Sequence, residues 1–234
     1  MISVCIATYN GEKYIKEQID SILSQLCDDD EVIISDDSSI DNTIEIIENY
    51  NDPRIKIFKG NTFYNPIFNF ENALKQTNGD YIFISDQDDI WLPNKVKVTM
   101  SYLKKYDCVV SNAVIVDANG NILYDSFFKK NKSRRGFLYN FLKNGYLGCC
   151  MAFNRKILKY ALPFPSNIPM HDIWIGLVAE IFGKSFFLEE SLVCYRRHDF
   201  NYSMASEKSK NSLVVKLEYR IILLVNIIKK IFYL

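Results

Sequence analysis

The chain has 234 residues, a length that fits one α/β domain with a C-terminal extension better than two complete domains. Its 28 Lys and Arg residues equal its 28 Asp and Glu residues and form no long basic run, which excludes the electrostatic signature of a general nucleic-acid binder. The six cysteines include no C-x-x-C pair and no Cys/His cluster at zinc spacing, so we expect reduced structural thiols instead of a zinc site.

The chain enters an apolar, strand-like run at Ile2 with no basic segment and no long apolar stretch before it. We therefore expect no secretory signal and a cytoplasmic protein. Over the first hundred residues, such apolar runs alternate with segments of helical period, which is the pattern of a parallel sheet with right-handed crossovers. Strands are expected at residues 2–7, 31–35, 54–58 and 81–85.

Two segments between these strands have the features of helices. Tyr14 to Leu26 places its Ile and Leu side chains on one helical face, and Asp41 or Asn42 can cap a second helix that carries Ile44 and Ile47. The first half of the chain therefore alternates strands and helices in the order βαβαβαβ.

The second half of the chain mixes helices and strands without regular alternation, and residues 129–135 are expected to form a basic surface loop. The other expected elements are a helix at 94–105, a hairpin that pairs 108–116 with 122–124, a strand near 147–153, a helix at 172–181, and strands at 185–188 and 192–196.

Polar side chains directly follow three of the predicted strands. Thr8 to Glu12 follow the first strand, Asp36 to Ser39 follow the second, and Asp86 to Asp89 follow the strand at 81–85. Ligands of open α/β sheets bind outside the carboxyl ends of the strands. The sequence therefore predicts a polar ligand site at this edge of the sheet.

Asp86, Asp88 and Asp89 would repel one another if all three were ionised close together, and a raised pKa or a bound cation relieves such repulsion. Mg²⁺ or Mn²⁺ suits carboxylate ligands and commonly takes its remaining oxygens from water and phosphates, which makes a diphosphate the natural companion ligand. The alternative is that these acids cap the following helix or line a turn.

Asp36 and Asp37 have two interpretations. A carboxylate at this edge can accept a hydrogen bond from the N3–H of uracil or thymine, while the loop after Thr8 seats the base and the ribose. The alternative is an Asx turn after the strand.

These motifs, taken together and in order, resemble those of the family 2 glycosyltransferases. The matching segments are Ala7-Thr8-Tyr9-Asn10-Gly11, Asp36-Asp37-Ser38-Ser39-x-Asp41-x-Thr43, Asn78-Gly79-Asp80-Tyr81 and Ser85-Asp86-Gln87-Asp88-Asp89-x-Trp91. The resemblance covers about the first hundred residues and looks closest to the rhamnosyltransferase-like branch, whose enzymes build bacterial surface polysaccharides.

The resemblance implies a GT-A fold, which is an α/β fold with a mostly parallel nucleotide-binding sheet, a mixed second half and flanking helices. It implies an inverting, metal-dependent hexosyltransferase that takes a sugar from a UDP- or dTDP-sugar and passes it to a saccharide or lipid-linked saccharide. Mg²⁺ or Mn²⁺ would be its cofactor.

The resemblance also implies roles for individual residues. Asp172, in His171-Asp172-Ile173-Trp174, would be the general base, with a helix N-cap as the alternative. The metal ligands would be Asp88 and His198, although His198 could instead contact the diphosphate or be a surface histidine at a strand end. The expected donor contacts are Thr8, Tyr9, Asn10, Glu12, Asp36, Asp37, Ser38, Asp86, Gln87 and Arg196. The expected acceptor contacts are Asp89, Trp91, Gly148, His171 and Trp174, although ordinary packing also explains the glycine and the two tryptophans.

The last segment, Leu213 to Leu234, is apolar but is interrupted by charged residues, and its longest apolar run, Ile221 to Val225, is too short to span a bilayer. A helix on the inner face of the membrane and a helix packed on the domain are both compatible with this pattern. We expect a catalytic domain at residues 1–205 and a helical extension at residues 206–234.

Other functions fit the sequence less well. A sugar-phosphate nucleotidyltransferase would have a Gly-rich basic loop after the first strand, and a haloacid-dehalogenase-like phosphatase would have its Asp-x-Asp there. A dinucleotide-dependent oxidoreductase would have a G-x-G-x-x-G motif after a strand. A nucleotide-sugar-binding relative without catalysis remains an alternative, because only an assay separates it from an enzyme.

Overall fold

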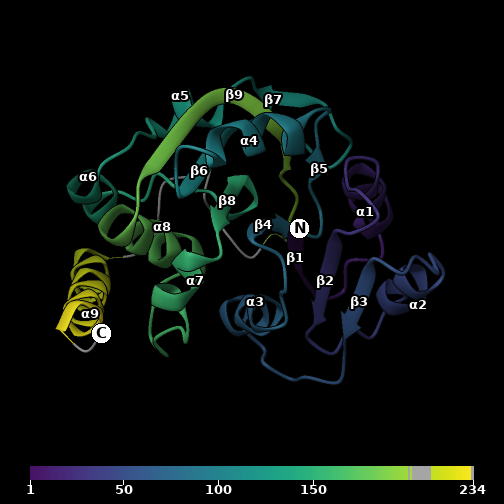
Figure 1. Ribbon diagram of the computed structural model, residues 1–234, viewed down its shortest axis with the longest axis horizontal. Coiled ribbons are helices and arrows are strands. Elements are labelled where there is room, and N and C mark those ends of the chain that lie inside the picture. The colour runs from purple at the N-terminus through teal and green to yellow at the C-terminus, as the bar shows by residue number, and fades with distance from the viewer. Residues whose placement is uncertain (200, 202–211, 233–234) are drawn as a thin grey trace.

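The computed structural model describes residues 1–199, 201 and 212–232, and its strands form one curved sheet with helices on both faces (Figure 1). The strands are β1 (Ile2–Thr8), β2 (Glu31–Asp36), β3 (Ile55–Phe58), β4 (Tyr81–Asp86), β5 (Ile90–Trp91), β6 (Cys108–Val116), β7 (Ile122–Tyr124), β8 (Met151–Asn154) and β9 (Ser185–Arg196). The helices are α1 (Ile15–Leu23), α2 (Thr43–Glu48), α3 (Pro66–Lys75), α4 (Lys95–Leu103), α5 (Phe127–Asn131), α6 (Phe137–Leu142), α7 (Lys156–Ala161), α8 (His171–Phe182) and α9 (Leu213–Phe232), with a short 3₁₀ helix at Gly148–Cys150.

The strand order is β3-β2-β1-β4-β8-β6-β9-β5, with β7 paired to β6. The first four strands are parallel to one another, as the alternating sequence predicts. Residues of β1, β2 and β4 such as Val4, Ile33 and Ile84 are completely buried, because helices cover both faces of this half.

The register of the parallel strands determines where the site lies. Thr8 at the end of β1 is paired with Asp36 at the end of β2, and Ala7 is paired with Asp86 at the end of β4. The three polar segments that follow these strands therefore start side by side at one edge of the sheet, as predicted.

The second half of the sheet is mixed. β8 is antiparallel to both β4 and β6, whereas β9 runs parallel to β6. The strands expected at 185–188 and 192–196 are one continuous strand, β9, because register shifts in β6 near Asn112 allow the pairing to continue. The mixed α/β fold with flanking helices agrees with the fold expected from the sequence.

Several local predictions were wrong or incomplete. The basic segment 129–135 is not wholly a loop, because α5 extends to Asn131 and Ser126 caps its first turn. The strand expected near 147–153 begins as the 3₁₀ helix, and only Met151–Asn154 pairs as β8. The boundary expected between residues 205 and 206 lies outside the described residues, as do 206–211 and 233–234 of the expected extension.

Buried Glu31 fixes the end of the sheet opposite the site. Its carboxylate accepts hydrogen bonds from the Ser3 hydroxyl at 2.6 Å, the backbone N–H of Asn78 at 2.6 Å and the Lys56 ammonium at 2.7 Å. Burial raises the pKa of Glu31, but these hydrogen bonds outweigh burial and lower the pKa from 4.5 to about 2. The ionised carboxylate therefore connects β1, β2, β3 and the turn before β4.

We predict that Glu31→Gln lowers the free energy of unfolding at pH 7 by about 1–3 kcal/mol, because the amide leaves buried donors without an acceptor. A group with a lowered pKa in the folded state stabilises the protein above its unfolded pKa. The difference between wild type and variant should therefore shrink as pH falls below about 4.5 towards 2.

Urea denaturation across this pH range measures the difference. The control is Glu48→Gln, which removes an exposed ion pair with Lys59 and should change stability by no more than about 0.5 kcal/mol. Equal effects of the two substitutions would contradict the assigned role of Glu31.

Candidate active site

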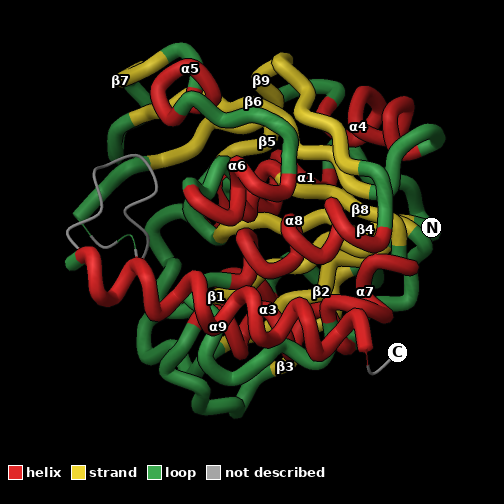
Figure 2. The backbone as a smooth tube through the Cα atoms, turned by 90° about the vertical axis from the view of Figure 1, so that its left-hand side faces the viewer, coloured by secondary structure: helices red, strands yellow, loops and turns green. Residues whose placement is uncertain are grey.

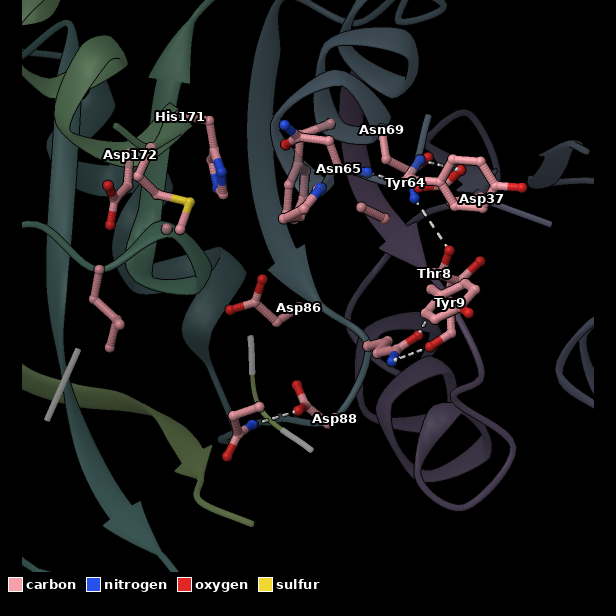
Figure 3. Close-up of a pocket in the computed structure, with 18 of the residues that line it drawn as sticks. Thr8, Tyr9, Asp37, Tyr64, Asn65, Asn69, Asp86, Asp88, His171 and Asp172 are labelled. Atoms are coloured by element: carbon pink, nitrogen blue, oxygen red, sulfur yellow. Dashed lines mark hydrogen bonds between the residues drawn. The ribbon is translucent and has the colours of Figure 1, made fainter. Parts of the chain in front are cut away.

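A cavity of about 500 Å³ opens at the edge of the sheet where β1, β2 and β4 end (Figure 3). Its walls come from the segments after these strands, from α3, from the 3₁₀ helix and from the beginning of α8. Thr8, Tyr9, Asp37 and Tyr64 lie on one side of the cavity, Asp86 and Asp88 lie at its centre, and Asp172 and His171 lie across from the first group (Figure 3).

Asp37 organises one side of the cavity. Its carboxylate accepts hydrogen bonds from the backbone N–H groups of Phe63, Tyr64 and Asn65, and therefore holds the loop before α3. Two of these bonds go to Oδ1 and one to Oδ2, so the carboxylate keeps room for a further donor. The Tyr64 ring is 81% exposed and the Tyr9 ring 52% exposed, which leaves two aromatic faces available beside this carboxylate.

Gln87 fixes the loop that follows β1. Its side-chain oxygen accepts from the Tyr9 N–H at 2.9 Å, and its side-chain nitrogen donates to the Tyr9 carbonyl at 3.0 Å. Both Gln87 and Tyr9 line the cavity. The DQDD segment therefore holds the loop after the first strand.

Four predicted donor contacts do not line the cavity. Asn10 accepts from the backbone of Ile40, Glu12 binds Asn42, Asp36 accepts from Thr8 and Ser39, and Ser38 donates to the Asn61 carbonyl. The polar atoms of Asn10, Glu12, Asp36 and Ser38 tie neighbouring loops together, so these side chains support the site from outside it.

Asp86 and Asp88 bring two carboxyl groups into the cavity. Burial, then repulsion from Asp88 and Asp172, raises the pKa of Asp86 to about 8. One Asp88 oxygen is 2.8 Å from His198 Nε2 and 2.8 Å from Asn201 Nδ2. Asp88 and His198 offer a carboxylate oxygen and an imidazole nitrogen, which are donor types that a divalent cation can use, so these two residues fit the metal role expected from the sequence.

A second group of possible ligands lies deeper. One ligand atom each from Asp86, Asp89 and Cys149 lies within 4.8 Å of the others, and Asp89 Oδ2 is buried without a hydrogen-bond partner among the described residues. Burial raises the pKa of Cys149 well above its ordinary value, which keeps the thiol protonated. A protonated thiol is a poor ligand for a hard cation, so the Asp88 side fits Mg²⁺ or Mn²⁺ better.

Asp172 lies in the first turn of α8, where Met170 is the N-cap residue. The capping alternative is therefore wrong for Asp172. Its Oδ1 accepts from the Ile173 N–H and, at 3.3 Å, from Asn144. Burial outweighs these bonds and raises the pKa of Asp172 to about 6, which is a suitable range for a base that works near neutral pH.

His171 presents a bare imidazole to the cavity. The side chain is buried, it packs on the Phe70 ring with centroids 4.2 Å apart, and neither ring nitrogen has a hydrogen-bond partner among the described residues. Burial lowers the pKa of His171 to about 3, so the ring is neutral and offers one donor and one acceptor. Unpaired nitrogens in a cavity wall are suited to sugar hydroxyl groups.

The structure places four other predicted contacts outside the cavity. Asp89 accepts from the backbone N–H of Arg196, whose guanidinium donates to the Asp88 carbonyl and pairs with Glu17. Trp174 is completely buried, and its indole N–H donates to the Ala161 carbonyl. Trp91 packs against Phe83 in the core. Asp89, Trp91, Trp174 and Arg196 therefore do not line this cavity, and their roles as ligand contacts stay predictions.

Other residues of the cavity were not found from the sequence. They are Tyr64, Asn65, Pro66, Asn69, Phe70, Leu147, Met170, Tyr195 and Asn201. The Asn65-Pro66 pair was an available signal, because Asn at the N-cap followed by Pro at the first turn marks the start of α3. That helix start would have placed Tyr64 next to the predicted nucleoside site.

The sequence matches the model of "Glycosyl transferase family 2" over residues 3–161. The dTDP-rhamnosyl transferase RfbG of Shigella flexneri is 32% identical over an alignment of 216 residues that covers 84% of this chain and 72% of that protein. The chain belongs to glycosyl transferase family 2. A UDP-Glc:alpha-D-GlcNAc-diphosphoundecaprenol beta-1,3-glucosyltransferase of Escherichia coli, WfgD, is 27% identical over 77% of this chain and 70% of its own length.

Solved structures share the fold of this family 2 chain. Staphylococcus aureus TarS 1–349, in complex with UDP-GlcNAc, superposes with a TM-score of 0.75 and 22% identity over 97% of this chain, which spans 66% of that protein. The mannosyltransferase PcManGT of Pyrobaculum calidifontis, in complex with GDP-Man and Mn²⁺, has a TM-score of 0.64 and 18% identity over 86% of this chain and 58% of its own. Both confirm the GT-A fold.

The family 2 match covers the strand ends that carry Asp37, Asp86 and Asp88, whereas Asp172 and His198 lie beyond residue 161. Their placement beside the matched segments is therefore an observation of the structure alone.

We predict that Gly148→Ala impairs the site more than the fold. A Cβ at Gly148 would lie 2.8 Å from His171 Nε2, and Phe70 blocks the retreat of the ring. Displacement of His171 and the adjacent Asp172 should lower kcat/KM by about 10- to 100-fold.

Gly183→Ala is the matched control, because its Cβ would meet the Asp107 side chain at 2.8 Å and Gly183 does not line the cavity. Both variants should lose thermal stability, but only Gly148→Ala should lose activity per folded molecule. Full activity in Gly148→Ala would argue against the position assigned to the reaction centre.

Proposed function

We propose that this family 2 chain is an inverting glycosyltransferase that moves a sugar from a UDP- or dTDP-sugar to a hydroxyl of a saccharide acceptor during bacterial surface polysaccharide synthesis. The observation that carries the proposal is that Asp37, Asp88 and Asp172, from three separate parts of the chain, line one cavity. Each carboxylate would have its own part in the reaction: Asp37 would bind the nucleoside, Asp88 the cation, and Asp172 the proton of the acceptor hydroxyl.

Asp37 and the two tyrosines would bind the nucleoside. The free acceptor capacity of Asp37 suits the N3–H of uracil or thymine, and Tyr9 and Tyr64 offer faces on which a base can stack. A dTDP-sugar donor in the name of the Shigella relative and UDP-GlcNAc in the TarS complex support this donor class.

Asp88 and His198 would hold Mg²⁺ or Mn²⁺ next to the diphosphate, with Asp86 close by. A divalent cation, when bound there, neutralises the charge that develops on the leaving diphosphate. The Mn²⁺ in the mannosyltransferase complex supports this assignment. The positive charge of such a cation would also offset the repulsion between carboxylates that helps to raise the pKa of Asp86.

Asp172 would act as the general base. Its carboxylate takes the proton of the acceptor hydroxyl while that oxygen attacks the anomeric carbon from the face opposite the diphosphate, and the bond between the anomeric carbon and the diphosphate oxygen breaks. Asn144 orients the carboxylate, and the neutral imidazole of His171 binds a hydroxyl of one of the two sugars. Gly148 leaves space for that sugar.

The acceptor would be a saccharide or a lipid-linked saccharide at the cytoplasmic face of the membrane. The diphosphoundecaprenol-linked acceptor in the name of the Escherichia coli relative supports the lipid-linked form.

We predict that Asp172→Asn lowers the transfer rate by about a hundredfold or more and leaves donor affinity nearly unchanged, because the amide cannot accept the proton. The rate of the wild type should rise with pH through about 6, since only the ionised form of Asp172 is a base.

Product formation from a UDP- or dTDP-sugar measures the rate, and calorimetry measures donor binding. Asp80→Asn, at a side chain that is 77% exposed, is the control and should keep full activity. Full turnover by Asp172→Asn would remove this residue from the role, whereas donor binding without turnover in the wild type would indicate a silent nucleotide-sugar-binding protein.

We predict that one class of UDP-, dTDP- or GDP-sugar raises the thermal midpoint of the wild type only when Mn²⁺ or Mg²⁺ is present. In Asp88→Asn the metal-dependent part of this stabilisation should disappear, because the cation loses its principal carboxylate. Thermal-shift measurements with and without a chelator provide the comparison. Equal metal-dependent stabilisation of wild type and Asp88→Asn would place the cation elsewhere.

A further inference from the structure

Helix α9 turns its most apolar face away from the protein. Val214, Leu217, Ile221, Leu224, Ile228 and Ile231 recur every three or four residues and are between 44% and 76% exposed. Only Leu223 and Ile227 of this helix are buried. A surface helix normally buries its apolar stripe and exposes its polar one, so the orientation of α9 is reversed. Such a continuous exposed stripe indicates a surface that meets something other than water.

Polar contacts hold α9 in this orientation. Arg220 donates to the Leu142 carbonyl at the end of α6, and Lys230 donates to the Leu162 carbonyl just after α7, each at 2.9 Å. Figure 2 shows α9 in front on this side of the molecule, with α6 above it and α7 beside its C-terminal end. Arg220 and Lys230 therefore attach α9 to the rest of the protein, and their side of the helix faces inward.

Helix α6, which contacts α9, also exposes apolar side chains. Leu138 and Leu142 of α6 are 74% and 71% exposed, and the Arg220 bond places the end of α6 beside α9. We call the exposed apolar residues of α9 together with Leu138 and Leu142 the α6–α9 face.

Positive charge surrounds the α6–α9 face. Residues 126–171, which include α6 and α7, contain nine Lys and Arg residues and no Asp or Glu, although the whole chain has a formal net charge of zero. Lys132, Arg134, Arg135 and Lys143 flank α6 and are exposed. Glu218 of α9 is exposed and Glu180 of α8 lies near Arg135, so the cations outnumber the acids around this face but are not alone there.

We propose that the α6–α9 face lies on a membrane surface that contains anionic lipids. An apolar helical stripe with Lys and Arg beside it combines burial in the acyl boundary with attraction to negative headgroups. A second copy of the chain is a less suitable occupant, because a two-fold contact through this face would bring two electropositive regions together. None of the helices among the described residues is long and apolar enough to cross a bilayer.

This contact has a consequence for the acceptor, which rests on the function proposed above. The chain runs from Leu142 of α6 through Asn144, which binds Asp172, to Leu147 and Gly148 in the cavity wall. A face seated on lipid would therefore lie a few residues from the base, on the approach of a lipid-linked acceptor.

Flotation of the full chain with vesicles tests the proposal. The wild type should float with phosphatidylcholine vesicles that contain phosphatidylglycerol and only weakly with phosphatidylcholine alone. The triple variant Ile221→Ser, Leu224→Ser, Ile228→Ser should bind anionic vesicles about tenfold or more weakly, because it loses apolar area on the exposed stripe.

The matched control replaces three other exposed apolar residues, Ile40→Ser, Ile122→Ser and Leu123→Ser, which lie outside the α6–α9 face and should not affect flotation. Wild-type flotation that the stripe variant retains in full would overturn the proposal, as would a wild type that does not bind anionic vesicles. A dimer that the stripe variant dissociates, without vesicle binding, would assign the face to a second copy and also overturn it.

A charge variant separates attraction to headgroups from apolar burial. Lys132→Gln, Arg134→Gln and Arg135→Gln together should weaken binding to anionic vesicles by roughly fivefold for each cation removed, and added salt should weaken wild-type binding. Equal binding of the wild type to neutral and anionic vesicles would overturn the requirement for anionic lipid.

Thermal stabilisation by nucleotide sugars, measured on the stripe variant, separates this inference from the proposed function. Stabilisation equal to that of the wild type, together with lost flotation, supports the membrane face and shows an intact donor site. A wild type that floats but responds to no nucleotide sugar would refute the proposed function and leave the membrane contact standing.

Discussion

The parallel pairing of β1 with β2 and β4 is the constraint on which the rest of the site depends. It aligns Thr8 with Asp36 and Ala7 with Asp86, and so forces three polar segments to the same edge. Carboxylates brought together in this way repel one another, and the raised pKa of Asp86 records both that repulsion and the burial of the group. The same edge thus combines a rigid backbone with several carboxyl groups whose repulsion the proposed cation would relieve.

The sequence was sufficient for the features that follow from local pattern. Apolar runs with polar residues at their ends predicted the buried parallel strands and their shared edge, because burial on both faces leaves a plain signal in composition. The acidic residues of Asp86 to Asp89 stood out because they directly follow a buried strand, whereas Asp172 was assigned only through the resemblance to the family 2 glycosyltransferases, and both roles stay predictions. Cavity walls from α3 and the Asn201 contact depend on long-range packing, which leaves little local signal.

The predicted contacts that lie outside the cavity share one physical feature. Asp89, Arg196, Trp91 and Trp174 stand beside cavity residues or candidate ligands in the sequence, but adjacent residues of a strand or helix point in different directions. The Asp89 carboxylate accepts a hydrogen bond from the Arg196 backbone N–H. The Trp174 indole N–H donates to the Ala161 carbonyl inside the core. A motif therefore identifies a region of the chain. Packing then decides which of its residues face the cavity and which are buried in the interior.

The carboxylate of Asp37 has a dual task. Because it accepts three backbone N–H groups from residues 63–65, the loop that bears Tyr64 is ordered without a ligand. A disordered loop would lose conformational entropy on binding, so this order would let more of the contact energy with the proposed nucleotide appear as affinity. Tyr64 has a left-handed backbone conformation with φ of 49°, and this strain is the conformational cost of holding the loop in this shape.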